Sequence, residues 1–401
     1  MKMKKNNLLI LAVAALGFAA CANDETTAVN EKLAESNAIS FRTLVSGQMR
    51  AAVDINTANL TEFKVTAFKH GEYDYDDAYI PDVTFTGTSA TSYTSTTKYY
   101  WPASDGKLDF YAYSPIANGN GLSISAYNTF VLTPTVTTET VGSQADLIYA
   151  AVKNKGKGDA TTEGQIALNF RHAGAKVALK VTHANSNTAK NLYFKVKGWA
   201  VGYLDKSATF TFPDYNTSND ANTVEHNNGS SDSYLLPVGY WTANDGYATD
   251  KQIYRSSDLG TAVDVAGTAG TPTGAVTNHT FAEEMILIPQ SGASLASEYS
   301  ATTADAEPNG TFVAVKLAVY DVNTNTVIVP ETWAMWPATV SWVPGKKYTY
   351  NVQLDEGGYY EKNTDAGNDV LDPIFKGAVI SFATVKVDEW RAANVDVTPA
   401  P

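Results

Sequence analysis

The chain has 401 residues, of which 44% are hydrophobic and 18% are charged, and its formal net charge is −13 at pH 7. The apolar content excludes a disordered chain, and the length predicts two domains with cores of their own. The negative charge argues against a nucleic-acid-binding protein, because phosphate contacts need a basic surface.

The first residues have the pattern of a bacterial lipoprotein export signal. Lysines precede an apolar run over residues 8–18, and small residues precede Cys21. We expect residues 1–20 to be a signal peptide and Cys21 to carry lipid; the alternative is an ordinary signal peptidase site after Ala20. Cys21 is the only cysteine, so no disulfide can form within one chain.

A strand and a cuttable arginine follow. Ile39 and Phe41, and then Leu44 and Val45, give an alternating apolar pattern that predicts a half-buried strand. Small polar residues then lead to Arg50 and Ala51, where a trypsin-like protease could cut. Arg42 is a poorer cleavage site because it lies inside the strand. Residues 21–50 are therefore predicted to be a removable segment that contains the first strand.

The rest of the chain is predicted to consist of strands. Alternating or apolar runs are typical of a β-sandwich at residues 60–69, 83–85, 98–102, 107–113, 129–136 and 146–152 in a first domain, 51–160. The Gly- and Lys-rich stretch 153–164 predicts a flexible connection. A second domain, 161–401, has further runs up to residue 354 and a long surface excursion at 243–278. A tail from about residue 357 ends in an alternating strand at 378–387. No helical period occurs after the signal peptide, which predicts an all-β protein of two antiparallel β-sandwiches.

No pattern of catalytic or metal-binding residues stands out. The five histidines are scattered, and nucleophile and phosphate-loop motifs are missing. Asp74, Asp76 and Asp77 could ligate Ca²⁺, but without a loop glycine or closing glutamate they indicate a solvated turn. Glu283 and Glu284 are neighbours, and neighbours on a strand point to opposite faces. We predict a protein that is not an enzyme and has no metal or cofactor.

Two aromatic clusters have two interpretations. The runs Tyr99-Tyr100-Trp101 and Trp333-Ala334-Met335-Trp336 could stack on sugar rings. They could equally supply the core, because alternation turns half of each cluster inward, and this second interpretation is favoured.

Several motifs together resemble the fimbrillin family of Bacteroidales, the subunits of type V pili. The resemblance rests on Tyr99-Tyr100-Trp101-Pro102, on Gly106-Lys107-Leu108-Asp109-Phe110-Tyr111-Ala112-Tyr113-Ser114-Pro115, on Ala145-Asp146-Leu147-Ile148-Tyr149-Ala150, on Phe170-Arg171-His172 with Ala175-Lys176-Val177, and on Gly345-Lys346-Lys347-Tyr348-Thr349-Tyr350. It extends over nearly the whole chain.

The resemblance implies two transthyretin-like domains and assembly at the outer membrane and cell surface. An Arg-specific protease would remove the lipidated segment, and a C-terminal strand of another subunit would fill the open groove. In this sequence Arg50 matches the cleavage position, and Ile39, Phe41 and Leu44 match the strand that is lost. The donor strand would be 378–387, with Val379, Ile380, Phe382, Val385 and Val387 as its apolar positions.

Two functions therefore stand at this stage. The first is a shaft or tip subunit of a pilus, whose partners are other subunits, the protease and the membrane through its lipid. The second is a permanently lipidated surface protein that binds glycans or host ligands. Arg50 and the tail favour the first function, and the aromatic clusters leave room for the second.

Overall fold

The structure is a computed structural model of the full chain. It describes residues 38–45, 59–72, 77–88, 92–103, 106–114, 123–126, 129–132, 141, 144, 146–160, 165–183, 192–205, 208–213, 223–226, 234–237, 239–243, 251–267, 272–292, 310–355, 359–362, 370–373 and 386–389. For 44–45, 123–126, 129–132, 223–226, 234–237, 359–362, 370–373 and 386–389 only the backbone is described. Within these residues the regular structure is strand, apart from single 3-10 turns such as η2 (Lys157–Asp159). The predicted all-β class is confirmed.

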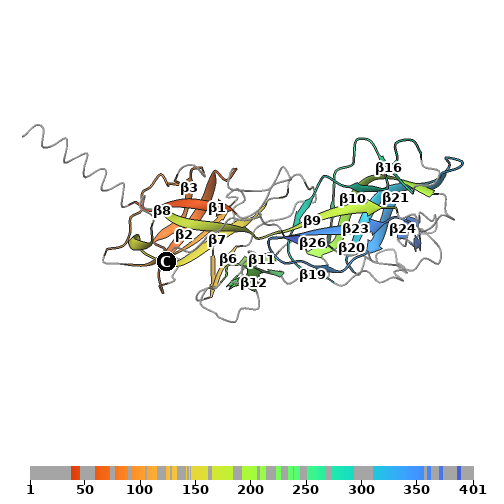
Figure 1. Ribbon diagram of the computed structural model, residues 1–401. Coiled ribbons are helices and arrows are strands. Elements are labelled where there is room, and N and C mark those ends of the chain that lie inside the picture. Colours follow the sequence, from red (N-terminus) through yellow and green to blue (C-terminus); the bar gives the residue numbers. More distant parts are fainter. Residues whose placement is uncertain are drawn as a thin grey trace, which may run out of the picture.

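The N-terminal unit is built on a six-stranded sheet, at the left of Figure 1. Its strands, in spatial order, are β1 (Ser40–Val45), β8 (Gln165–His172), β7 (Ile148–Lys155), β4 (Leu108–Ser114), β2 (Glu62–Lys69) and β3 (Ile80–Thr86). Strand β4 is buried along its whole length, because Phe110 and Ala112 face one core while Tyr111 and Tyr113 face another. The alternation of the sequence thus serves two hydrophobic layers.

A short segment joins the two ends of this sheet. Thr94 exchanges main-chain hydrogen bonds of 2.9 and 3.0 Å with Thr86 of β3, and Tyr93 exchanges bonds of 2.8 and 3.1 Å with Phe41 of β1. The residues around Tyr93 therefore connect the first strand of the order to the last. The main hydrophobic core of the unit lies inside the closed sheet.

A smaller sheet is shared between the two halves of the chain. It has the order β14 (Tyr240–Ala243), β11 (Ala208–Thr211), β6 (Thr129–Leu132) and β5 (Ser123–Ala126). Strands β5 and β6 come from the N-terminal half, and β11 and β14 from the C-terminal half. Trp241 of β14 donates from Nε1 to the Ala173 carbonyl at 2.7 Å, and the Gly239 amide donates to Tyr149 Oη at 2.9 Å.

The C-terminal unit is a sandwich of two sheets. One has seven strands, β15 (Lys251–Arg255), β10 (Leu192–Asp205), β20 (Phe312–Asp321), β21 (Val327–Pro337), β24 (Tyr359–Lys362) and β25 (Val370–Pro373), with β16 (Val263–Ala266) also on β10. The other has five, β17 (Asn278–Thr280), β9 (Ala175–Thr182), β23 (Lys346–Gln353) and β26 (Lys386–Glu389), with β18 (Met285–Leu287) also on β9. Two pairs complete the set, β12 (Thr223–His226) with β13 (Tyr234–Pro237) and β19 (Ser291–Gly292) with β22 (Val340–Ser341).

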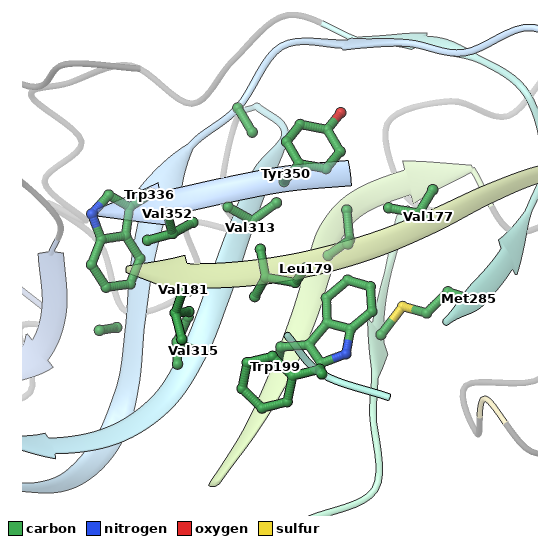
Figure 2. Close-up of a cluster of buried hydrophobic side chains, with 14 of the residues drawn as sticks. Val177, Leu179, Val181, Trp199, Met285, Val313, Val315, Trp336, Tyr350 and Val352 are labelled. Atoms are coloured by element: carbon green, nitrogen blue, oxygen red, sulfur yellow. The ribbon is translucent and has the colours of Figure 1, made fainter. Parts of the chain in front are cut away.

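The core of this sandwich lies between β9 and β23 on one side and β10 and β20 on the other. Figure 2 shows side chains of both sheets meeting in one cluster, among them Trp199 of β10 and Leu179 of β9. Trp199 is fully buried, and its Nε1 donates to the Glu283 carbonyl at 3.2 Å. A large ring whose single polar atom is satisfied suits the middle of a sandwich.

The strand arrangement differs from the sequence prediction at three points. The prediction of two antiparallel sandwiches did not include the two parallel pairs, β1 with β8 and β9 with β23. The prediction also placed β8 in a second domain starting at 161, whereas β8 pairs in the N-terminal sheet and the chain crosses between the units at Ala173–Gly174. The alternating apolar residues of β8 pack into the N-terminal core, which explains this place. The expected excursion at 243–278 contains β15 and β16, both paired with β10.

Candidate functional site

Strand β1 lies inside the N-terminal sheet and has neighbours on both sides. It runs parallel to β8 in the register Phe41 opposite Ile166 and Thr43 opposite Leu168. On its other side the Ile39 amide donates to the Tyr99 carbonyl at 2.7 Å, and the Phe41 amide donates to the Tyr93 carbonyl at 3.1 Å. Figure 1 shows β1 beside β8. Removal of β1 would therefore expose two rows of main-chain groups.

Phe41 is the central side chain of this strand. It is 0% exposed, and its ring centroid lies 4.8 Å from that of Phe85, 5.3 Å from that of Phe110 and 6.1 Å from that of Phe63, each in edge-to-face geometry. Ile39, two residues earlier, is 3% exposed and belongs to the same core. The first strand thus supplies the middle of the N-terminal core.

The other side chains of β1 point to both faces. Thr43 shares the face of Ile39 and Phe41 and is 5% exposed, whereas Ser40, at 9% exposure, and the exposed Arg42 point to the opposite face. Thr43 Oγ1 has no hydrogen-bond partner among the described residues. We define the β1 groove as the space filled by the side chains of Ile39, Phe41 and Thr43.

Tyr93 forms one wall of the β1 groove, although no sequence pattern singles it out. Its side chain is fully buried, its hydroxyl donates to the Leu60 carbonyl at 2.7 Å, and its ring lies 4.9 Å from Phe63. Tyr93 stands in a run of Ser and Thr that has no apolar alternation. An isolated large aromatic residue in such a run is the only sequence signal it gives.

The structure describes some of the predicted site residues and leaves others outside. Cys21, Arg50, Ala51, Val379, Ile380, Phe382 and Val385 lie outside the described residues. Leu44 is in β1, where only its backbone is described. Val387 is in β26, which pairs antiparallel with β23 so that Val387 lies opposite Tyr348.

The two aromatic clusters divide between core and surface. Tyr99 and Trp101 are half-buried against the N-terminal core, while Tyr100 is 41% exposed. Trp336 is in the core of the C-terminal sandwich. Trp333 is half-buried and packs against a small cluster on the other face of the sheet. The clusters mainly build the cores, as the favoured interpretation predicted.

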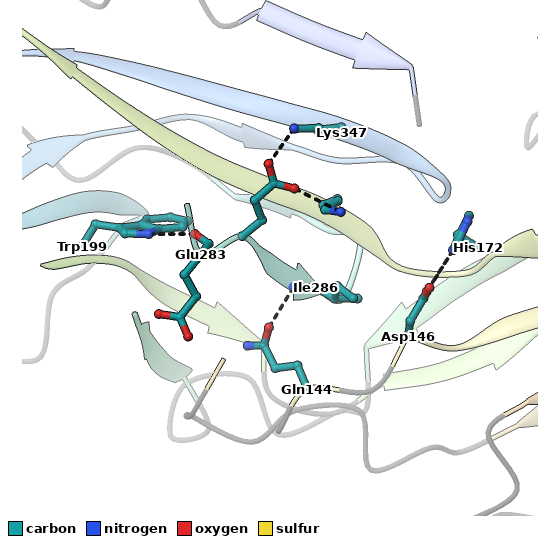
Figure 3. A network of polar contacts seen from close by, with 9 residues as sticks. Gln144, Asp146, His172, Trp199, Glu283, Ile286 and Lys347 are labelled. Atoms are coloured by element: carbon teal, nitrogen blue, oxygen red, sulfur yellow. Dashed lines mark hydrogen bonds and ion pairs between the residues drawn. The ribbon is translucent and has the colours of Figure 1, made fainter. Parts of the chain in front are cut away.

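The two neighbouring glutamates have different partners, and Figure 3 labels the first of them, Glu283. Glu283 accepts hydrogen bonds from the Ser257 amide and hydroxyl at 2.6 and 3.2 Å. Glu284 accepts from Lys347 at 2.6 Å and lies 3.0 Å from Lys176 Nζ. Burial on its own raises the pKa of Glu284, but the hydrogen bonds from both lysines outweigh it, so the pKa stays below its ordinary value. This is an ion-pair cluster between β9 and β23.

Polar contacts also stabilise the region where the chain passes from one unit to the other. The buried His172 places Nδ1 at 2.9 and 3.0 Å from the two carboxylate oxygens of Asp146. Gln144 Oε1 accepts from the Ile286 amide at 2.8 Å (Figure 3). In the described part of the chain, no three His, Cys, Asp or Glu residues come together in a way that suits a metal ion. The described part also contains no helix with the length and apolarity needed to cross a bilayer.

These features define an all-β protein whose N-terminal sheet is completed by a strand from the start of its own chain. The model of the fimbrillin-like family matches residues 50–370. The chain therefore belongs to the fimbrillin-like family, a family of pilus and adhesion proteins. No match is found among curated proteins.

Solved structures of Bacteroides proteins resemble the chain at low sequence identity. A fimbrial protein from Bacteroides vulgatus is 14% identical with a TM-score of 0.45, covering 88% of this chain and 99% of its own. A candidate cell adhesion protein from Bacteroides ovatus is 14% identical with a TM-score of 0.43, covering 89% and 99%. The family assignment rests on the family model alone.

Proposed function

We propose that this protein is a structural subunit of a cell-surface pilus and assembles by replacement of β1. It is exported as a lipoprotein through Cys21, held at the outer membrane, and cut after Arg50 by an Arg-specific protease. The cut separates β1 from the body of the subunit. A strand from the tail of another subunit then fills the β1 groove. In this role the protein is not an enzyme.

The observation that carries the proposal is the interior place of β1. It is bonded to β8 on one side and to Tyr93 and Tyr99 on the other, and Phe41 is fully buried. Full burial of Ile39 and Phe41 contributes about 1.5–3 kcal/mol each. Loss of β1 without a replacement would forfeit this burial and expose the rows of main-chain groups. A second strand is thus a requirement of the fold after cleavage.

The position of the two arginines supports cleavage at Arg50. Arg42 has an exposed side chain, but its backbone is paired with Ala167 of β8. A protease needs an extended, unpaired stretch of backbone, so cutting at Arg42 requires β1 to leave the sheet first. Arg50 follows the last residue of β1 by five positions.

Limited trypsin treatment of the purified precursor tests the proposal. The wild type and the matched variant Arg42→Ala should be shortened after Arg50 and should form ladders of multimers that resist mild denaturant. Arg50→Ala should stay monomeric and folded.

Normal pili in cells that produce only Arg50→Ala would overturn the proposal. N-terminal sequencing of protein taken from the cell surface separates the two functions. A start at Ala51 supports the pilus subunit, and a lipidated Cys21 on all surface molecules supports the permanently lipidated binding protein.

A further inference from the structure

The tail of the chain repeats the sequence of β1. Residues 39–44 are Ile-Ser-Phe-Arg-Thr-Leu, and residues 380–385 are Ile-Ser-Phe-Ala-Thr-Val. Four of the six positions are identical, and the last position exchanges one branched aliphatic side chain for another.

The identities coincide with the positions that the structure buries. Ile39, Ser40, Phe41 and Thr43 are 3%, 9%, 0% and 5% exposed, and all four are repeated in the tail. Arg42 is the exposed position, and it alone is replaced by an unrelated residue. Apolar alternation does not account for the repeat, because it requires neither the serine nor the threonine. Thr43 Oγ1 is buried and has no hydrogen-bond partner among the described residues, so valine would suit this position at least as well as threonine. The repeated threonine is therefore a likeness beyond the apolar pattern.

We propose that residues 380–385 of a second copy of this chain replace β1 residue for residue, parallel to β8. This inference rests on the proposed function and adds the partner, the register and the direction to it. Phe382 enters the space of Phe41, with Ile380 in the place of Ile39 and Thr384 in the place of Thr43. The partner that fits is a copy of the chain itself, which makes the protein a shaft-forming subunit.

The main-chain pairing follows from the register of β1. Phe382 comes to lie opposite Ile166, and Ala383 opposite Ala167, as Phe41 and Arg42 do now. The amides of Ile380 and Phe382 donate to the carbonyls of Tyr99 and Tyr93. A reversed strand would also fill alternate positions, but it would place Thr384 in the space of Ile39. The order of the repeated residues therefore selects the parallel direction.

The groove and the tail are different parts of the chain, so the contact between copies is head-to-tail. Such a heterologous contact produces an open filament unless its rotation closes a ring. Because one chain contains both the groove and the strand that fills it, copies of this chain can form a filament without a second protein.

Disulfide cross-linking in the cut protein tests the register. The native Cys21 is removed by the cut, so engineered cysteines are the only thiols. Ala383→Cys with Ala167→Cys should give a ladder that reductant dissolves, because neighbouring strands are about 4.8 Å apart and disulfides span Cα distances of about 4.4–6.8 Å. Two control pairs combine Ala383→Cys with a second cysteine at another position of β8, and each reports a different placement of the donated strand. Asn169→Cys reports a two-residue slip, and Gln165→Cys reports the opposite slip or a reversed strand.

A pair of phenylalanine variants tests the pocket. Phe382→Ala should weaken multimer formation about a hundredfold, as expected for the loss of a fully buried phenyl ring. Phe375→Ala, in the same tail but outside the repeat, should change multimer formation by less than about twofold. Multimers that form normally with Phe382→Ala, or that cross-link best at 165 or 169, would overturn the register and leave the proposed function standing.

Absence of multimers from cut wild-type protein would instead count against the proposed function. In that case a synthetic peptide of residues 377–388 with Ala383→Cys is added to cut monomer. Selective cross-linking to Ala167→Cys supports the register, and failure to cross-link overturns it.

Discussion

Phe41→Ala in the uncut precursor is the most direct test of how β1 is held. The substitution removes a fully buried ring that makes edge-to-face contacts with three other rings at 4.8–6.1 Å. Replacement of a buried phenylalanine by alanine costs about 3–5 kcal/mol. This loss corresponds to an opening equilibrium of β1 that rises by about a hundredfold to a few thousandfold.

Hydrogen exchange measured by mass spectrometry resolves this effect. The amides of Phe41 and Tyr93 are bonded across the groove, so peptides that contain them should lose protection in Phe41→Ala. Peptides from β20 in the C-terminal sandwich should exchange as in the wild type. The matched control is Arg42→Ala, whose exposed side chain predicts a change within about 0.5 kcal/mol. Equal exchange in Phe41→Ala and Arg42→Ala would refute the argument that Phe41 holds the strand.

Three further variants test other parts of the structure. Cys21→Ala should leave the precursor without lipid and absent from the outer membrane fraction, as measured by metabolic labelling and fractionation; unchanged fractionation would contradict a lipoprotein. Glu284→Gln concerns stability against pH. Because the folded pKa of Glu284 is held below its ordinary value of 4.5, the carboxylate stabilises the protein above about pH 4.5, and this contribution is lost as the pH falls through the folded pKa. The free energy of unfolding is measured by chemical unfolding between pH 3 and 7. In Glu284→Gln it should depend less on pH below about 4.5 and should be about 3 kcal/mol lower than in the wild type at pH 7, and Glu283→Gln should change both quantities less. Equal effects of the two substitutions would argue against a stabilising ion-pair cluster at Glu284. Gly202→Ala places a Cβ 2.1 Å from the ring of the cross-strand phenylalanine and should lower the free energy of unfolding by about 1–3 kcal/mol, whereas Gly260→Ala, with nothing within 4 Å, should be tolerated; equal stability of the two would contradict the close packing.

Local pattern predicted many of the strands, but it did not predict their partners. The alternation of Ile39 and Phe41 predicts one inward face, and the structure buries both. The same kind of pattern predicts β8, but not that it pairs with β1 and β7, because pairing depends on residues far away in the sequence. A Gly- and Lys-rich stretch before β8 resembled a linker, although part of it completes β7 and a capped turn.

The remaining differences have a physical origin in composition. Strands β15 and β16 contain strand-favouring residues, but they lie in a segment rich in Gly, Ser and Asp that predicts a loop, and both pair with β10. The burial of Tyr93, the wall residue of the β1 groove, is also hard to predict from sequence, because it depends on closure of the sheet through the pairing of Thr86 with Thr94. In both cases the local signal is short and surrounded by residues that predict a loop.

The sheet shared between the halves has a mechanical consequence. The chain passes between the units at Ala173–Gly174, and a lone extended connection of this kind would act as a hinge. Bending there would have to disturb the packing of Ala208 and Trp241, of the small sheet, against Ile288, which follows β18 in the C-terminal unit. The small sheet packs on both units and therefore stiffens the junction between them.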